Sequence, residues 1–322
     1  MEISNIPWLN KIYIKINYDI FPHGLIISGP KGIGKKVLAK KISLDLLQNH
    51  EEIKNDLNLF NKGNHPDLFL LDKDKILINH ITYRDEKWDE QKGKRNLNDF
   101  ISKTPSISNN KVALILNAES MKNPSQNALL KTLEEPASNS FIIMTVNRSN
   151  SLQKTIYSRC QNITIPNITK SEVDDWLIKQ GISDVKSNDF PSYMTPYRIL
   201  EDIGSDKQND YKIFVQNISL FVSNHIDQNK ALKNISDMDI NTIEKCNYIT
   251  ELLKIILKSK LLSENLSGIY EIFCNSKFNN LKISNLINEI NEIKYDYFKV
   301  PQINETHIMN YIFSEIKNTI KI

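Results

Sequence analysis

The eight residues GPKGIGKK, 29–36, follow the apolar run GLIIS and indicate a phosphate-binding loop. Gly29, Gly32 and Gly34 allow a tight turn that directs successive backbone N–H groups inward, where they can bind an anion. The helix predicted to follow adds the positive end of its dipole. Lys35 stands where the lysine of this motif reaches the β- and γ-phosphates of a nucleotide. ATP or ADP is therefore the predicted ligand.

The position after this lysine departs from the pattern. A Ser or Thr usually stands there, and its hydroxyl binds Mg²⁺. The residue here is Lys36, which has no lone pair to offer while it is charged. The loop can therefore still hold a phosphate, with Lys36 beside it, or be retained only for its turn geometry. We expect no metal ligand among its side chains.

Hydrolysis of ATP would also need a carboxylate at the end of a neighbouring strand, to orient Mg²⁺ and the attacking water. The candidate strand is KVALIL, 111–116, and Asn117 and Ala118 follow it. Neither side chain can act as a base or as a charged metal ligand. Glu119 is the only nearby acid, and because it lies beyond the strand end we expect an exposed loop or cap residue. These residues argue against hydrolysis at this site.

The first half of the chain must position these residues, and it alternates between strands and helices. Five short runs rich in β-branched residues are bounded by turn residues, as is typical of buried strands: GLIIS, DLFLLD, KVALIL, SFIIMTV and QNITIP. Helical patterns lie between them. The alternation predicts an α/β domain, with a parallel sheet and helices on both faces.

The second half is different in texture. Six of the nine glycines and eight of the eleven prolines lie before residue 167, and the later pattern is helical almost throughout. We therefore predict three domains. They are an α/β domain at 1–166, a small helical domain at 167–206 and a larger helical domain at 207–322.

The overall composition is ordinary. The chain has 322 residues, of which 25% are charged and 40% hydrophobic, and its net charge of +3 does not by itself indicate nucleic-acid binding. The three cysteines are far apart and form no C-x-x-C pair, so we expect free thiols in a reducing cytoplasm. No apolar run is long enough for a signal peptide or a membrane span, so no membrane association is expected.

A dense cluster of charge occupies residues 79–98. We interpret it as a solvated helix and loop. A phosphate-binding or partner-binding surface is the alternative.

Three further segments carry a family resemblance. In chain order they are GNHPDLFLLD, NPSQNALLKTLEEP and SFIIMTVNRSNSLQKTIYSRCQ. Together with the loop they resemble the AAA+ clamp-loader family, and within it the delta-prime subunits of bacterial DNA polymerase III. The first of them resembles the family's His-Pro-Asp segment, and the third its sensor-1 strand followed by a Ser-Arg-Cys motif. The second, read from its pattern alone, is an amphipathic helix whose sequence also looks like that of the family. The size and texture of residues 167–206 and 207–322 suit the family's lid and collar domains.

The resemblance implies a heteropentameric ring of motor subunits, a delta-type subunit and this chain. Such a ring loads the sliding clamp onto primed DNA, which it contacts mainly through phosphates, with energy from ATP. Delta-prime members act mainly as stators. The arginine of Ser-Arg-Cys, here Arg159, is implied to be an arginine finger that completes the ATP site of the neighbouring subunit. Without the motif, a surface salt bridge would be the simplest role for Arg159.

Two more residues are candidates for the chain's own nucleotide site. Asn147 falls near the sensor-1 position, where a polar side chain could orient water or phosphate, and it could equally be a turn residue. Arg198, in TPYRIL, is a candidate sensor-2 residue of the lid.

The family also implies a zinc module that is missing here. Many members carry four cysteines before the His-Pro-Asp segment, whereas HEEIKNDLNLFNKGNHPD contains none. His50 and His65 alone cannot form a tetrahedral zinc site, so we expect no zinc.

These observations predict a non-hydrolysing AAA+ subunit of a replicative clamp loader. One alternative is an autonomous AAA+ ATPase, for which Glu119 is the only acid near Asn117. The other is a scaffold protein that binds no nucleotide.

Overall fold

A computed structural model of the chain describes residues 3–47, 53–82, 96–274, 276–299 and 304–321. The chain forms two compact units: Met1–Gly181 with Thr195–Tyr197, and Ile182–Met194 with Arg198–Ile322. Each unit has a hydrophobic core of its own. The finer division into three domains stays a prediction.

The first unit is built on a parallel sheet of five strands in the order β2-β3-β4-β1-β5. The strands are β1 (Gly24–Ser28), β2 (Leu68–Asp72), β3 (Lys111–Leu116), β4 (Ser140–Val146) and β5 (Gln161–Thr164). All neighbouring pairs are parallel, so their carboxyl ends meet at one edge. The predicted strands are confirmed. Every residue of β1 and β3 is buried, as a sheet covered on both faces requires.

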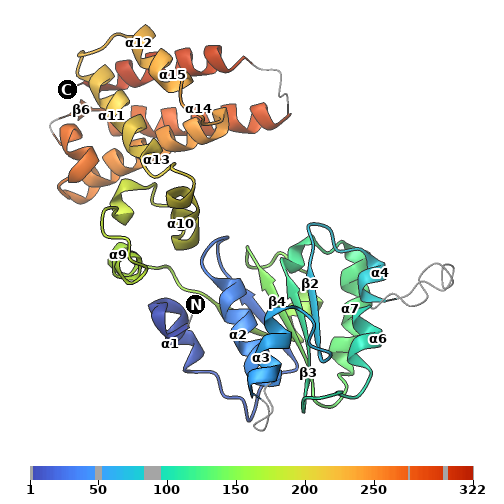
Figure 1. The fold of residues 1–322 in the computed structure, drawn as a ribbon. Helices are drawn as coiled ribbons and strands as arrows, with labels where there is room; N and C mark the ends of the chain where they lie inside the picture. The colour runs from blue at the N-terminus through green and yellow to red at the C-terminus, as the bar shows by residue number, and fades with distance from the viewer. Residues whose placement is uncertain (1–2, 48–52, 83–95, 275, 300–303, 322) are drawn as a thin grey trace. The chain divides into compact units, whose positions relative to one another are not determined.

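Helices cover both faces of this sheet (Figure 1). On one side lie α2 (Lys35–Leu47) and α3 (Ile53–Asn61), and on the other α4 (Ile78–Ile81), α6 (Leu97–Ile101) and α7 (Asn123–Glu134). On the second side, Ile26 and Ile115 of the strands pack in one core with Leu129 of α7. The predicted α/β domain, with a parallel sheet and helices on both faces, is confirmed.

The other helices among the described residues of the first unit are short. They are the 3-10 helices η1 (Ile3–Asn5) and η3 (Ala118–Ser120), and the α-helices α1 (Pro7–Tyr13), α8 (Lys154–Tyr157) and α9 (Lys170–Lys179). The rings of Trp8 and Trp176 join α1 to α9 edge to face, with centroids 5.4 Å apart. Lys11 also forms an ion pair with Glu172 at 2.6 Å. The N-terminal helix is thereby held beside a segment about half a chain away.

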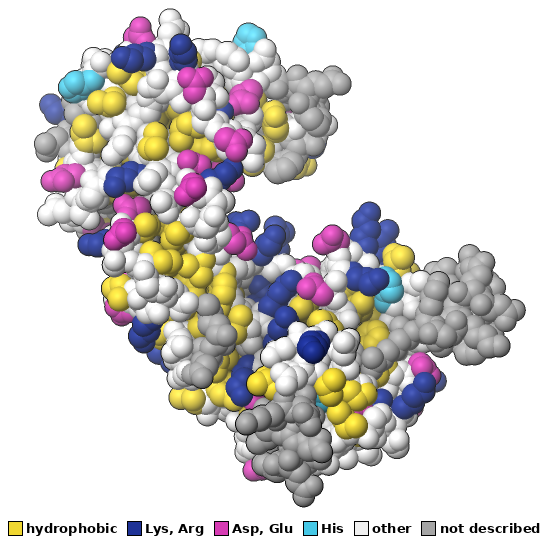
Figure 2. All heavy atoms as spheres, viewed as in Figure 1, with side chains coloured by type: hydrophobic (Ala, Val, Ile, Leu, Met, Phe, Trp, Pro, Cys, Tyr) yellow, Lys and Arg dark blue, Asp and Glu magenta, His cyan; other side chains and the backbone are white. Residues whose placement is uncertain are grey.

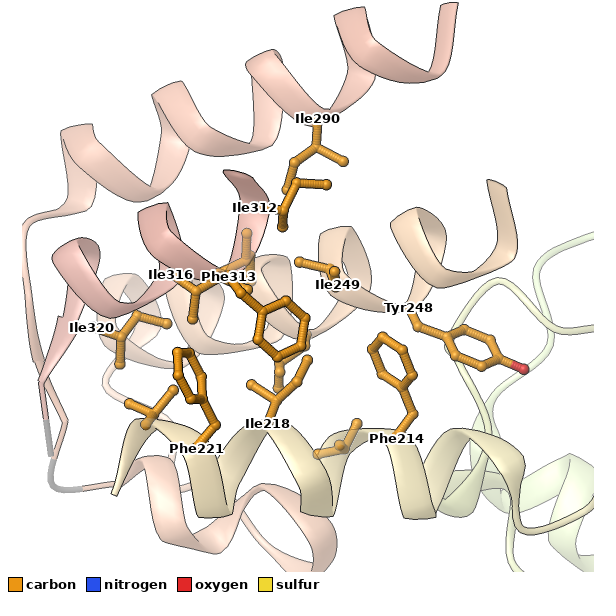
Figure 3. Close-up of a cluster of buried hydrophobic side chains, with 14 of the residues drawn as sticks. Phe214, Ile218, Phe221, Tyr248, Ile249, Ile290, Ile312, Phe313, Ile316 and Ile320 are labelled. Atoms are coloured by element: carbon orange, nitrogen blue, oxygen red, sulfur yellow. The ribbon is translucent and has the colours of Figure 1, made fainter. Parts of the chain in front are cut away.

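From Ser187 onward the described residues are mostly helical, as predicted. Its elements are η4 (Ser187–Asp189), α10 (Pro196–Gly204), α11 (Asp210–Val222), α12 (Gln228–Ser236), α13 (Thr242–Leu262), η5 (Gly268–Phe273), β6 (Lys277–Phe278), α14 (Asn280–Lys299), α15 (Glu305–Thr319) and β7 (Ile320–Lys321). Figure 3 shows the core of the second unit. Phe214 and Phe221 of α11 point toward Ile249 of α13 and Phe313 of α15, and all four are fully buried.

The surface of the second unit carries charges of both signs. Acidic and basic side chains are interspersed over the face visible in Figure 2, with apolar side chains between them. None of the described helices combines the length and apolarity that crossing a bilayer requires. Most of the charged segment 79–98 lies outside the described residues, so its role stays a prediction.

Candidate functional site

The loop between β1 and α2 needs glycine at two positions. Gly32 and Gly34 have φ angles of 82° and 100°, in the left-handed region that other residues rarely adopt. A Cβ atom on Gly34 would lie 2.8 Å from Leu9 Cδ1 and 3.1 Å from Tyr197 Cε2. The loop is therefore tightly bent, and side chains from distant parts of the chain cover it.

Three carbonyl groups of the loop accept hydrogen bonds from residues far away in the sequence. The pairs are Thr195 Oγ1 with Lys31 O at 2.7 Å, Tyr197 N with Gly32 O at 3.0 Å, and Trp8 Nε1 with Ile33 O at 2.9 Å. These bonds fix the loop from outside. They also leave its N–H groups on the opposite side of each peptide unit.

The backbone N–H groups of Gly32 and Gly34 donate no hydrogen bond to any described residue. Helix α2 begins directly after them, at Lys35, so its positive end faces the same space. Unpaired N–H groups at a helix start are suited to bind an anion. Phosphate binding by the loop stays a prediction.

The ammonium group of Lys35 is enclosed by oxygen atoms of its own chain. Lys35 is only 5% exposed. Its Nζ donates to Gly29 O at 2.6 Å, Pro30 O at 2.7 Å and Asn147 Oδ1 at 2.9 Å. Burial lowers the pKa of Lys35 to about 8, although the charge of Glu119 acts in the opposite direction. Three acceptors match the three donors of the ammonium group.

The expectation of an exposed Glu119 is wrong. Glu119 is half-buried, and its Oε1 accepts hydrogen bonds from the backbone N–H of Asn147, at 3.1 Å, and from Asn147 Nδ2. Asn117 adopts a left-handed conformation with φ of 53°, and the 3-10 turn Ala118–Ser120 follows. This turn directs Glu119 back to the carboxyl end of the neighbouring strand β4. Asn is enriched in this conformation, but its presence alone does not show where the following turn directs its side chains.

The other predicted features of the strand end are as expected. Ala118 is fully buried, and the backbone N–H of Asn117 donates to Thr145 Oγ1 at 3.0 Å. Neither residue supplies a carboxylate. The structure therefore brings Lys35, Asn147 and Glu119 together, with the acid in the 3-10 turn that follows the end of β3.

Lys36 pairs with a carboxylate that the sequence analysis did not single out. Its Nζ lies 3.1 Å from Asp72 Oδ2, at the carboxyl end of β2, and both side chains are about half exposed. The position of Asp72 at the end of a predicted strand was the signal that could have identified it. Lys36 thus holds a surface ion pair where the motif would hold a hydroxyl.

Arg159 lies in the turn between α8 and β5, where its guanidinium group is anchored to the same unit. Its Nη2 is 2.7 Å from Oε1 of Glu134, the last residue of α7. Its Nη1 donates to Thr155 O at 2.9 Å and to Ser158 Oγ at 3.3 Å. About a third of the side chain is exposed, so the group can still be approached from solvent. The finger role implied by the resemblance stays a prediction.

Comparison with known proteins identifies the family. Residues 8–169, half of the chain, match the profile described as "DNA polymerase III, delta subunit". The chain belongs to this DNA polymerase III delta-subunit family. Like the motifs, the match falls on the first unit.

Several relatives of this chain carry the name DNA polymerase III subunit delta'. One from Haemophilus influenzae is 30% identical over 50% of each chain, so this chain spans about half the length of that relative. One from Buchnera aphidicola subsp. Schizaphis graminum is 27% identical over 92% of each chain. Among solved structures, a gamma subunit-related protein from Thermotoga maritima is 14% identical, with a TM-score of 0.46 and coverage of 98% of this chain and 99% of that one.

The His-Pro-Asp segment of this DNA polymerase III family member stabilises the fold. Asp67 is fully buried, and its carboxylate accepts the backbone N–H groups of residues 106–108 and the hydroxyl of Ser108. Burial alone would raise the pKa of Asp67, but these hydrogen bonds lower it below its usual value. His65 Nδ1 accepts the Asp67 N–H at 3.1 Å, whereas His50 lies outside the described residues. The expectation that zinc is absent stays a prediction.

Arg198 belongs to the second unit, whereas Lys35 and Asn147 belong to the first. It lines a pocket with Glu201, Asp202, Glu244 and Tyr248. Burial and the neighbouring carboxylates raise the pKa of Asp202, while Arg198 acts against them. The sensor-2 role of Arg198 stays a prediction.

Proposed function

We propose that this chain is a delta-prime-like subunit of a replicative clamp loader. It acts as a stator that does not hydrolyse ATP, and it supplies Arg159 to the ATP site of a neighbouring motor subunit. Family membership and the names of the relatives support the proposal. The observation that carries it is the position of the Arg159 cation, which is held at the surface. At the chain's own site, by contrast, Asn117 and Ala118 stand where a hydrolysing site would have a carboxylate.

The chemistry of Arg159 suits this role. A guanidinium group stays charged at every physiological pH, and its planar fork can bind two oxygens of a γ-phosphate. Glu134 and the Thr155 carbonyl hold the group in one orientation, which lowers the entropy lost when a phosphate binds. A neighbouring subunit would have to exchange Glu134 for phosphate oxygens.

The proposed partners follow from this role. They are the motor subunits and a delta-type subunit of a heteropentamer in the cytoplasm, the sliding clamp, and primed DNA. Contact with DNA would be through phosphates, so we expect it to weaken as salt concentration rises.

The decisive experiment replaces Arg159 by Ala in a complex reconstituted with motor subunits, clamp and primed DNA. ATP hydrolysis by the complex should fall by about a thousandfold at the site that this arginine completes. Lys154→Ala is the matched control, because it removes an exposed cation from α8, the short helix that precedes Arg159. Equal activity of the Arg159→Ala and wild-type complexes would contradict the proposal.

One observation favours a second function, ATP hydrolysis by the chain's own site. Glu119 is a carboxylate hydrogen-bonded to Asn147, which in turn contacts Lys35. Steady hydrolysis by the purified chain, abolished in Lys35→Ala, would establish this function. A chain that acts as a scaffold would bind no fluorescent ATP analogue, with or without Mg²⁺.

A further inference from the structure

Three side chains form a continuous line of hydrogen bonds under the phosphate-binding loop. Lys35 Nζ donates to Asn147 Oδ1, and Asn147 Nδ2 donates to Glu119 Oε1. The three residues come from the start of α2, the end of β4 and the turn after β3. No sequence motif links Glu119 to this group, because the turn that brings it there depends on a single left-handed residue, Asn117.

Charge and donor chemistry allow only one orientation of the central amide. An ammonium group can only donate and a carboxylate can only accept. Asn147 must therefore turn its oxygen to Lys35 and its NH₂ group to Glu119. The backbone N–H of Asn147 also donates to Glu119 Oε1 at 3.1 Å, so the carboxylate holds the amide at two points. Asn147 therefore connects the Lys35 cation to the Glu119 carboxylate, although these two groups do not touch each other.

The Glu119 carboxylate has a strong electrostatic effect on Lys35. Its second oxygen, Oε2, is buried and accepts no hydrogen bond from the described residues. A buried, partly unsatisfied carboxylate keeps a large part of its electrostatic field. The field favours the charged form of Lys35, which burial disfavours.

A nucleotide phosphate would have to compete with this arrangement. All three donors of Lys35 already bond to oxygens of the chain, namely Gly29 O, Pro30 O and Asn147 Oδ1. A phosphate oxygen must displace at least one of them to contact the ammonium group. It must also approach the negative charge of Glu119, which repels it.

We infer that Glu119 is an internal substitute for phosphate. Through Asn147 it occupies and neutralises Lys35, so that the chain's own loop binds nucleoside di- and triphosphates weakly. The inference rests on the proposed function in one respect, that this loop is the nucleotide-phosphate site of the chain. Glu119 is in this sense a residue that sets affinity, and removing its charge should strengthen binding.

The test uses the full chain and the fluorescent probe mant-ADP, with and without Mg²⁺. Glu119→Gln keeps the shape and the acceptor oxygen but removes the charge. At about pH 6, well below the pKa of Lys35, the Kd for mant-ADP should fall by about tenfold. Lys35→Ala in the same background should abolish the gain. Glu135→Gln is the matched control, because it removes an exposed carboxylate from the same unit and should leave the Kd unchanged.

An unchanged or higher Kd in Glu119→Gln overturns the inference, and so does a lack of binding by both wild type and variant. Thermal unfolding of each variant shows whether it is folded. If Glu119→Gln does not fold, Glu119→Ala replaces it, with the same expected direction. The Arg159 experiment measures hydrolysis by motor subunits, so its failure and the failure of this inference are separate results.

Discussion

Lys35 and Arg159 are two candidate phosphate-binding cations of the first unit, and their surroundings differ. Lys35 is buried, and all three of its donors bond to oxygens of the same chain. Arg159 lies at the surface in a turn, where one carboxylate, Glu134, anchors it. A cation that is internally satisfied gains little from a new phosphate, whereas a cation at the surface can exchange its partner. This difference supports the proposal that Arg159, rather than Lys35, contacts a nucleotide phosphate, held by another chain.

The largest expected effect on stability tests whether the loop that holds Lys35 depends on its backbone geometry. Gly34→Ala should lower the free energy of unfolding by about 3 kcal/mol, because φ is positive and the new Cβ meets Leu9. Ser158→Ala, in the Arg159 turn, should change it by less than about 0.5 kcal/mol. Urea denaturation of both variants provides the measurement. Similar losses in the two would remove this difference between the regions.

The next effect tests whether the Arg159 side depends on the shape of the cation. Arg159→Lys keeps the charge but loses the planar fork, so hydrolysis at the neighbouring site should fall by about a hundredfold in the reconstituted complex. ATPase turnover is the measurement. Full activity of the lysine variant would mean that charge alone is needed.

A pH series tests whether phosphate binding at the loop depends on the charge of Lys35. Its pKa is lowered to about 8. Phosphate binds the charged form, so binding of mant-ADP to the loop should weaken by about tenfold between about pH 7 and about pH 9. Glu119 raises the pKa of Lys35, so Glu119→Gln should move this loss of binding to lower pH. A pH-independent Kd in the wild type would contradict the assignment, and Lys35→Ala provides the flat reference.

The smallest expected effect concerns the anchor of Arg159. Glu134→Gln removes an exposed ion pair, and such pairs contribute about 0–1 kcal/mol to stability. We therefore expect the free energy of unfolding to change by less than about 1 kcal/mol, measured by urea denaturation. A loss of unfolding free energy as large as that of Gly34→Ala would show that the Arg159 ion pair stabilises the fold as much as the loop around Lys35 does.

Local patterns predicted the scaffold of the site well. The five strands were recognisable because each is a short apolar run bounded by turn residues, and burial on both faces leaves that signature in the sequence. Glu119 was misassigned because its position depends on the left-handed Asn117 and on which strand lies beside β3. The contacts of Thr195 and Tyr197 with the loop were also beyond prediction, since they join residues about half a chain apart.

The sequence by itself determined the elements and the ligand chemistry available to them. Glycine spacing, apolar runs and the Ser-Arg-Cys motif are local features of the sequence. Backbone sterics explain the glycines, and burial explains the apolar runs. Only the tertiary structure decided which charges are compensated. The strand order in the parallel sheet differs from the strand order in the sequence, and this spatial order brings Glu119 and Asn147 to the site of Lys35. Arg159 instead stays at the surface, where it pairs with Glu134.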